Sequence, residues 1–465
     1  MNTRHSGRRA SARVARRGGG CIASPARVEP RTPLLKAVWL AALTGPLALG
    51  LGACGSLLGF ETLTLAHVDP GDSDGAPPTD DGSRSVDADG AADGADATPS
   101  MCDADLTNDP SNCGRCVHGC LGGACERGAC QPQKLAERLG VPEGLAVDGD
   151  SVFVAEFDTN RILKFGKATA PSPCTTAPLP TQCVFTEDQT LVFKPTAITV
   201  DATTVYWTNT GPYPHEIHSC GRAGCGVASI LVVKLAKGAF AYPNGLLLPI
   251  DLAIRDGQIF WAENTVGAIR SVPIGGGPIT TYVANAAYAP IAVAVDDTHI
   301  FFTDDSPGHP PQMQVVPRAS GAVSAVASPA GKAAGIALTG AGALFWTVPT
   351  VTAAGDGLVQ SALPASVPGG PRAATTTASS QVSPSAILTD AANVYWLEAG
   401  SANAATGRIL TCPLTGCPVQ GPVVLASQQK HPRHLAQDAT ALYWSNEGVA
   451  GSTTYDGEVW RVAKP

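Results

Sequence analysis

The sequence predicts an all-β protein whose main domain is a single seven-bladed β-propeller, with six blades as the alternative. The chain is rich in turn residues, with 51 Gly and 38 Pro among 465 residues. Only 15% of its residues are charged, which leaves little sequence for long charged helices. One strand–turn–strand pattern also recurs seven times, at a mean spacing of roughly 48 residues.

Residues 1–53 are predicted to be a signal peptide. A basic segment precedes the apolar run LLKAVWLAALTGPLALGLGA, which Pro46 and several glycines interrupt, as is typical of a leader rather than a membrane span. Leu51-Gly52-Ala53-Cys54 resembles a bacterial lipobox, which implies a diacylglycerol on Cys54. We therefore expect export and anchoring to the cell envelope, at the outer membrane. An ordinary signal peptide with a chance cysteine is the alternative.

Residues 54–101 are predicted to be a disordered acidic linker, because Asp, Gly, Ala and Pro dominate and few apolar residues are present. Its Asp-rich fragments lack the ligand spacing and the final Glu of an EF-hand, so no calcium site is predicted in the linker. No cofactor is predicted for the chain, with a calcium ion or another cation in the propeller channel as the alternative. The first 53 residues contain nine Lys/Arg and one acidic residue, so their removal changes the net charge from −8 to about −16. Such an acidic chain is a poor nucleic-acid binder.

The twelve cysteines that follow the anchor are predicted to form disulfides, because an exported chain meets an oxidising environment. Six belong to a small module at residues 102–130: Cys102, Cys113, Cys116, Cys120, Cys125 and Cys130. Their pairing cannot be deduced from spacing, and a zinc knuckle with Cys113, Cys116, His118 and Cys120 is the alternative. This module resembles small NCGxC-type modules of secreted bacterial proteins. The other six form close pairs: Cys174 with Cys183, Cys220 with Cys225, and Cys412 with Cys417.

Residues 131–465 contain the repeat that predicts the propeller. Apolar and polar residues alternate on both sides of an Asp/Gly-rich turn, as in a β-hairpin. The seven copies are GLAVDGDSVFVAE, AITVDATTVYWTN, DLAIRDGQIFWAE, AVAVDDTHIFFTD, GIALTGAGALFWTV, AILTDAANVYWLE and HLAQDATALYWSN. The aromatic position is held by Val154, Trp207, Trp261, Phe302, Trp346, Trp396 and Trp444, at spacings of 53, 54, 41, 44, 50 and 48. This period indicates one four-stranded blade per copy.

The repeat resembles the YWTD and NHL-like propeller families, which implies a propeller fold but no particular activity. The last copy supplies a third strand, GEVWRVAKP, but no fourth. We therefore predict that Gln133 to Leu139 complete the last blade and close the ring. The three cysteine pairs share one phase of the repeat and are predicted to bridge the connection between the third and fourth strands.

Candidate binding residues lie on the face opposite the Asp turns, here called the upper face. Four carboxylates end second strands and could form a ring around the channel mouth: Glu156, Glu263, Asp304 and Glu398. Hydrogen bonding within the blades is the structural alternative for these residues. His309 and His434 lie in or beside upper-face loops, but no nucleophile motif accompanies them, so no catalytic residue is assigned.

The leading hypothesis is a monomeric, non-enzymatic binding or scaffold module for a protein or glycan ligand, tethered to the membrane by its lipid alone. One competitor is a propeller enzyme similar to streptogramin lyases or lactonases, in which His434 or His309 acts beside Glu398 or Asp304. A purely structural envelope protein is the third hypothesis.

Overall fold

The computed structural model describes residues 105–167, 183–187, 192–210, 216–225, 230–234, 252–306, 310–319, 321–350, 355–362, 371–450 and 455–465. The chain divides into two compact units, Met1–Ala92 and Asp93–Pro465, and every described residue belongs to the second. The predicted leader, Cys54 and the linker lie outside the described residues. Within the described ranges no helix is long and apolar enough to cross a membrane.

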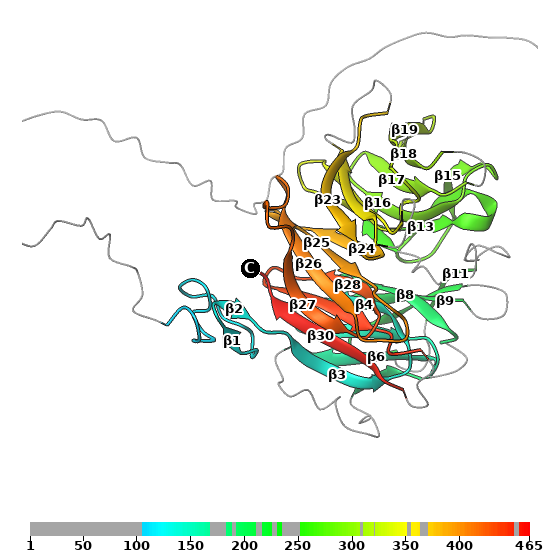
Figure 1. Cartoon of the computed structure of the whole chain (residues 1–465). Coiled ribbons are helices and arrows are strands. Elements are labelled where there is room, and N and C mark those ends of the chain that lie inside the picture. The colour runs from blue at the N-terminus through cyan, green and yellow to red at the C-terminus, as the bar shows by residue number, and fades with distance from the viewer. Residues whose placement is uncertain are drawn as a thin grey trace, which may run out of the picture. The chain divides into compact units, whose positions relative to one another are not determined.

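Seven four-stranded antiparallel sheets follow one another along the chain (Figure 1). Blade 1 contains β4 (Pro142–Val147), β5 (Ser151–Glu156), β6 (Arg161–Gly166) and β7 (Val184–Thr186). Blade 2 contains β8 (Pro195–Val200), β9 (Thr204–Asn209), β10 (Glu216–Gly221) and β11 (Ile230–Lys234). Blade 3 contains β12 (Ala253–Arg255), β13 (Gln258–Glu263), β14 (Ala268–Pro273) and β15 (Thr280–Ala284), with a 3₁₀ turn, η4 (Asn264–Val266), after β13.

The remaining blades repeat this order. Blade 4 contains β16 (Pro290–Val295), β17 (His299–Asp304), β18 (Gln312–Pro317) and β19 (Ser324–Ala327). Blade 5 contains β20 (Ile336–Leu338), β21 (Leu344–Val348), β22 (Gly357–Ala362) and β23 (Thr375–Gln381). Blade 6 contains β24 (Pro384–Thr389), β25 (Asn393–Glu398), β26 (Gly407–Pro413) and β27 (Val423–Gln429). Blade 7 contains β28 (Pro432–Gln437), β29 (Ala441–Asn446), β30 (Gly457–Ala463) and β3 (Gln133–Leu139). The prediction of seven blades is confirmed.

The ring closes with a strand from the beginning of the domain, as predicted. β3 pairs antiparallel with β30, with Gln133 opposite Arg461 and Leu139 opposite Gly457. Leu135 and Leu139 are fully buried in a core shared with blade 1. Because β3 takes the outer position of blade 7, it covers the edge that β30 alone would expose.

The repeated aromatic position fills the wedges between blades. All seven residues at this position, from Val154 to Trp444, have 0% exposure. Trp207 packs in a core that contains residues of blades 1 and 2, and Trp346 in one that contains residues of blades 4 and 5. Burial of such rings contributes a large share of the hydrophobic free energy, so this repeat position is structural.

The Asp turns lie on the face opposite the upper face, here called the lower face. In blade 7, Asp438 Oδ1 accepts hydrogen bonds from the amides of Thr440 and Ala441, both at 2.8 Å. Its Oδ2 accepts one from the Tyr443 hydroxyl at 2.9 Å. The same arrangement recurs in blades 2 and 6, so the Asp and the Tyr of the repeat serve one turn motif.

Disulfides form where the sequence predicts them. In the propeller, Cys220 bonds Cys225 and Cys412 bonds Cys417, each bridging the end of a third strand and the following turn. Cys183 is also disulfide-bonded, whereas Cys174 lies outside the described residues.

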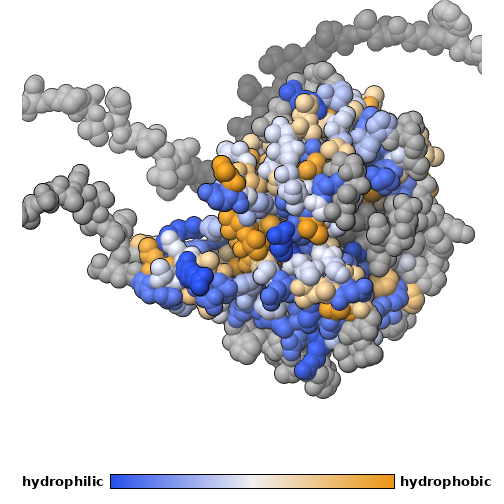
Figure 2. Space-filling view, viewed as in Figure 1, coloured by the Kyte–Doolittle hydropathy of each residue, from blue (hydrophilic) through white to orange (hydrophobic). Residues whose placement is uncertain are grey.

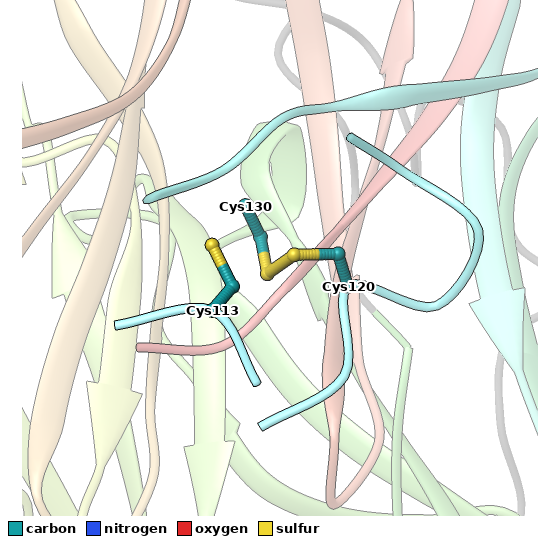
Figure 3. A group of neighbouring side chains, drawn as sticks. All are labelled: Cys113, Cys120 and Cys130. Atoms are coloured by element: carbon teal, nitrogen blue, oxygen red, sulfur yellow. A yellow bond between two sulfur atoms is a disulfide. The ribbon is translucent and has the colours of Figure 1, made fainter. Parts of the chain in front are cut away.

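The cysteine-rich module has a small two-stranded sheet, β1 (Cys125–Glu126) and β2 (Ala129–Cys130). Cys113 bonds Cys125 and Cys120 bonds Cys130; Cys116 is disulfide-bonded as well, and Cys102 lies outside the described residues. The sulfurs of Cys113, Cys120 and Cys130 lie within 4.8 Å of one another, and Figure 3 shows the Cys113 sulfur beside the Cys120–Cys130 disulfide. Zinc needs thiolate ligands, so the zinc-knuckle alternative does not describe this oxidised module.

The module contacts the lower face of blade 7. The His118 ring nitrogens lie 2.5 Å from the Cys113 carbonyl oxygen and 2.7 Å from that of Lys464. The Arg461 guanidinium, on β30, donates to the Leu121 carbonyl and to the Gln133 side chain. Polar contacts of this kind hold the module beside the closing strand.

Candidate functional site

The four candidate carboxylates at the ends of second strands are buried rather than open at the channel mouth. Exposure is 0% for Glu156 and Glu263, 8% for Asp304 and 1% for Glu398. Such burial requires hydrogen-bond partners, and each carboxylate has at least one, although among the described residues the Glu263 Oε2 has none.

Glu156 and Glu398 occupy equivalent positions in blades 1 and 6. Glu156 accepts a hydrogen bond from the Gly140 amide at 2.7 Å and pairs with Arg161 at 2.6 Å. Glu398 accepts one from the Val382 amide at 2.7 Å and pairs with Arg408 at 2.6 Å. In both blades the carboxylate thus holds the connection that enters its own blade from the preceding one.

Glu263 and Asp304 are engaged in a similar way. Glu263 accepts a hydrogen bond from the indole of Trp261 at 2.9 Å and pairs with Arg270 at 3.2 Å, while burial raises its pKa. Asp304 accepts hydrogen bonds from the Ala289 amide at 2.9 Å and the Ser306 amide at 3.1 Å. The contacts of all four residues favour the structural alternative over an open carboxylate ring.

The two candidate histidines have different outcomes. His309 lies outside the described residues. His434, on β28, lines the central channel, and its electrostatic interaction with Glu143 on β4 partly opposes the burial that raises the pKa of that carboxyl. The enzyme hypothesis places His434 or His309 beside Glu398 or Asp304, and Glu143 is not among the partners that the sequence suggests.

Glu143 and Arg433 lie at equivalent positions of neighbouring blades. Each follows the proline that begins an innermost strand. Each also lies at a shift of the strand register, which occurs between Pro142 and Gly144 for Glu143 and between Pro432 and His434 for Arg433. The Arg433 Nη2 lies 3.5 Å from the Glu143 Oε2. A bulge re-aims the side chain at that point, which is common beside functional sites.

Glu143 is the most strongly perturbed acid of this region. It is 1% exposed, and burial raises its pKa to about 7, aided by the charge of Glu447 and opposed by that of Arg433. Within the part of the chain that the structure describes, its Oε1 atom is buried without a hydrogen-bond partner. A buried carboxyl group with an unsatisfied oxygen is costly for stability, which marks it as a functional candidate.

Glu447 completes the group. Its Oε2 lies 2.6 Å from His431 Nδ1 and 3.4 Å from Arg433 Nε. Burial acts to raise the pKa of Glu447, but the His431 hydrogen bond and the Arg433 charge outweigh it and hold that pKa below its ordinary value. The two carboxyl groups therefore differ in protonation near neutral pH, as in acid–base pairs. We call Glu143, His431, Arg433, His434 and Glu447 the mouth cluster.

One signal in the sequence could have revealed this position. A proline begins five of the innermost strands, and the residue after it sits at the mouth end of that strand. These residues are Glu143, Thr196, Ile291, Ser385 and Arg433. A charged residue occupies this position only in the neighbouring blades 7 and 1, whereas the other three residues are small or apolar. This departure from the repeat could have identified the position from the sequence.

The central channel next to the mouth cluster is mainly apolar. It has a volume of about 380 Å³ and is lined by residues of the innermost strands. The only three His, Cys, Asp or Glu residues of the described chain whose ligand atoms cluster within 4.8 Å are the disulfide cysteines of Figure 3. The mouth cluster is therefore not arranged as a metal site in this structure.

No family model matches the chain, and no curated protein matches it. Among solved structures, virginiamycin B lyase from Staphylococcus aureus is similar at 16% identity over 72% of this chain and 99% of its own, with a TM-score of 0.48. A streptogramin B lyase is similar at 13% identity over 71% and 97%, with a TM-score of 0.49. A chain of a nidogen/laminin complex is similar at 14% identity over 59% and 96%, with a TM-score of 0.38. Values this low carry no inference about activity.

Proposed function

We propose that this protein is a lipid-anchored ligand-binding module of the cell envelope, and that its ligand contacts the mouth cluster between blades 7 and 1. The observation that carries this proposal is Glu143: a buried carboxyl with a pKa of about 7 and an unsatisfied Oε1. The aspartates of the lower-face turns and the candidate carboxylates of the upper face already have partners inside the fold. Glu263 also has a buried oxygen without a hydrogen-bond partner, Oε2, but in the mouth cluster such an oxygen occurs together with a channel-lining residue, His434.

In vivo photo-crosslinking tests the proposed site. Intact cells produce the full chain with p-benzoylphenylalanine at Ser385, beside the channel, or at the exposed Ala391 of a lower-face turn. We expect a discrete adduct from position 385 only, lost when Glu143→Gln is added. Equal labelling at both positions, or labelling indifferent to Glu143→Gln, would reject the site and favour a structural envelope protein.

Metabolic labelling tests the anchor. The Leu51-Gly52-Ala53-Cys54 motif supports lipidation, so radioactive palmitate should label the wild type in a globomycin-sensitive way and should not label Cys54→Ala. An unlabelled wild type that is released from cells would contradict anchoring.

General acid–base catalysis at the same cluster is the second candidate function. A carboxyl with a pKa of about 7 is suited to proton transfer at neutral pH. The ionised Glu447 of the same cluster can act as the base of an acid–base pair. Quinupristin, the ligand named for a solved virginiamycin B lyase, is a suitable first substrate. Turnover that falls at least about 100-fold in Glu143→Gln would support catalysis. Lack of turnover by the wild type would reject a streptogramin lyase activity.

A further inference from the structure

We propose that His118 is a proton-dependent latch between the cysteine-rich module and the propeller. Its ring holds the module against the end of blade 7 while both ring nitrogens carry protons, and the hold weakens when one proton is lost. The latch lies on the lower face, away from the mouth cluster, so it does not depend on the proposed ligand site.

The two hydrogen-bond partners of His118 require a charged ring. Its Nδ1 lies 2.5 Å from the Cys113 carbonyl oxygen, and its Nε2 lies 2.7 Å from the Lys464 carbonyl oxygen. A carbonyl oxygen accepts hydrogen bonds and cannot donate them, so both ring nitrogens must be donors. Neutral imidazole has one N–H group and imidazolium has two. The two contacts can therefore exist together only when the ring is protonated.

The Lys464 contact is the one that a neutral ring gives up. Cys113 is five residues from His118 in the same small module, so the contact between them closes a short loop at little entropic cost. Lys464 is separated from His118 by 346 residues and follows β30 of the propeller. Loss of the proton therefore weakens the contact between the module and blade 7 rather than the contact inside the module.

A second contact of the module is independent of pH. The Arg461 guanidinium, 5% exposed on β30, donates to the Leu121 carbonyl of the module and to the Lys167 carbonyl of blade 1. The Leu121 side chain also packs against the core shared by blades 7 and 1. Arginine stays protonated in proteins, so this contact persists when His118 loses its proton. The module is thus loosened on one side and is not released.

The module has little apolar packing of its own. Among the described residues its core consists of Cys113, Cys120 and Cys125, with Cys130 packed against them. On the face seen in Figure 2, hydrophilic residues cover much of the module and hydrophobic residues occur in small groups. The loss of a single polar contact can therefore change how firmly the module is held.

The residue before His118 is held in a strained conformation. Val117 has a φ of 60°, which a β-branched residue rarely adopts, and its side chain is 90% exposed. Its amide donates to the Asn112 side chain at 2.9 Å. Such a conformation persists where surrounding contacts impose it. The loop that presents His118 can therefore relax once the Lys464 contact is lost.

The charged and titratable groups around His118 do not oppose its protonation. The groups that line the cleft between the module and blades 6 and 7 are Arg115, Asp390, Tyr395, Asp438, Lys464 and the terminal carboxylate of Pro465. Asp390 pairs with Lys464 at 3.2 Å, and Asp438 pairs with Lys167 at 2.8 Å. Burial raises the pKa of Tyr395, so its hydroxyl stays neutral. Arg115 is exposed, where water and salt screen its charge. Among these residue types, histidine is the one that ordinarily titrates between pH 5 and 8.

Hydrogen–deuterium exchange of the purified full chain, followed by mass spectrometry, tests the latch. At pH 5.5, peptides of residues 105–130 should exchange at least about ten-fold faster in His118→Gln than in the wild type, because a charged hydrogen bond is lost. At pH 8 the two proteins should exchange equally, because the wild-type ring is then neutral. His299→Gln, at the lower end of β17 in blade 4, is the matched control and should match the wild type at both pH values.

The outcomes separate a latch from a merely structural histidine. Equal exchange of the module in His118→Gln and the wild type at pH 5.5 would overturn the latch. Exchange that is faster by the same factor at pH 5.5 and pH 8 would overturn the dependence on the proton. Peptides of Asn393–Glu398 in blade 6 should exchange alike in all variants at each pH, which shows that the propeller is folded. If His118→Gln fails this check, His118→Phe, which keeps a planar ring without donors, carries the same test.

Discussion

The carboxylates of the lower face and the carboxyl of Glu143 have opposite environments. Asp201, Asp390 and Asp438 each accept hydrogen bonds from two backbone amides and a tyrosine hydroxyl. Burial raises their pKa values, but these hydrogen bonds outweigh it and the pKa values are lowered. Glu143 has no such donors, and burial raises its pKa to about 7.

This contrast teaches how to separate structure from function in a repeat protein. The repeat aspartates of blades 2, 6 and 7 share the same hydrogen-bond donors, which are two amides of the turn and a tyrosine hydroxyl of the same blade. A carboxyl that occurs once cannot rely on the repeat for partners. Four predictions test the contrast between the lower-face turns and the mouth cluster.

The largest expected effect comes from Asp438→Ala. The change removes the acceptor for Thr440, Ala441 and Tyr443 and leaves Lys167, now 2.8 Å from the carboxylate, without its charge partner. We expect the free energy of unfolding to fall by about 4 kcal/mol, measured by urea denaturation at pH 7. Asp438→Asn keeps an acceptor oxygen and should lose about half as much. Equal losses in the two variants would contradict the hydrogen-bond explanation.

The second prediction concerns the pH dependence of stability. The pKa of Glu143 rises from 4.5 to about 7 on folding, so the folded state binds an extra proton between these values. The stability that Glu143 contributes through this extra proton is complete below pH 4.5 and is lost as the pH rises through 7. The free energy of unfolding of the wild type therefore falls over this window by up to about 3 kcal/mol.

Glu143→Gln should remove that part of the fall, measured as the difference in unfolding free energy between pH 5 and pH 8. Glu126→Gln, at an exposed position of the module, is the control and should keep the wild-type slope. An unchanged slope in the Glu143→Gln variant would show that Glu143 is not the group that titrates.

The third prediction concerns the lower-face disulfide of blade 6. Cys412 is fully buried and bonds Cys417 across a sequence separation of 5. Replacement of both by serine opens this small loop and should cost about 2 kcal/mol, because a short loop constrains the unfolded chain only modestly. The crosslink from position 385 should not change. A lost crosslink in a folded double variant would mean that the lower face also controls the site.

The smallest effect is expected for an aspartate of a lower-face turn that does not occupy the repeat position. Asp297 pairs with Arg255, and both side chains are largely exposed, at 74% and 45%. Asp297→Ala should change the free energy of unfolding by less than about 0.5 kcal/mol. A larger loss by thermal melting would show that repeat phase alone does not identify the structural carboxylates of this face.

Most of the fold could be predicted from local patterns. The alternation around each Asp turn indicates a hairpin, the spacing of Trp207, Trp261 and its equivalents indicates blades, and the missing fourth strand of the last copy indicates closure by Gln133–Leu139. Each of these features depends on residues close in sequence or on a regular period. The disulfides at Cys220 and Cys412 follow from the same period.

The mouth cluster could not be predicted in this way. Glu143 and Arg433 are separated by 290 residues, and only ring closure brings blades 1 and 7 together. The candidate carboxylates, including Glu156 and Glu398, looked accessible in the sequence because strand ends usually meet loops. Whether they face water depends on how the entering connection folds over them, which the sequence does not encode locally.

The sequence by itself determined the hairpins, the number of blades, the closing strand and the cysteine pairs of blades 2 and 6, because periodicity and turn chemistry act over short distances. Only the tertiary structure decided which carboxyl groups are satisfied. Burial and charge depend on side chains that distant blades bring together, and Glu143 acquires its raised pKa from surroundings that do not exist until the ring is closed.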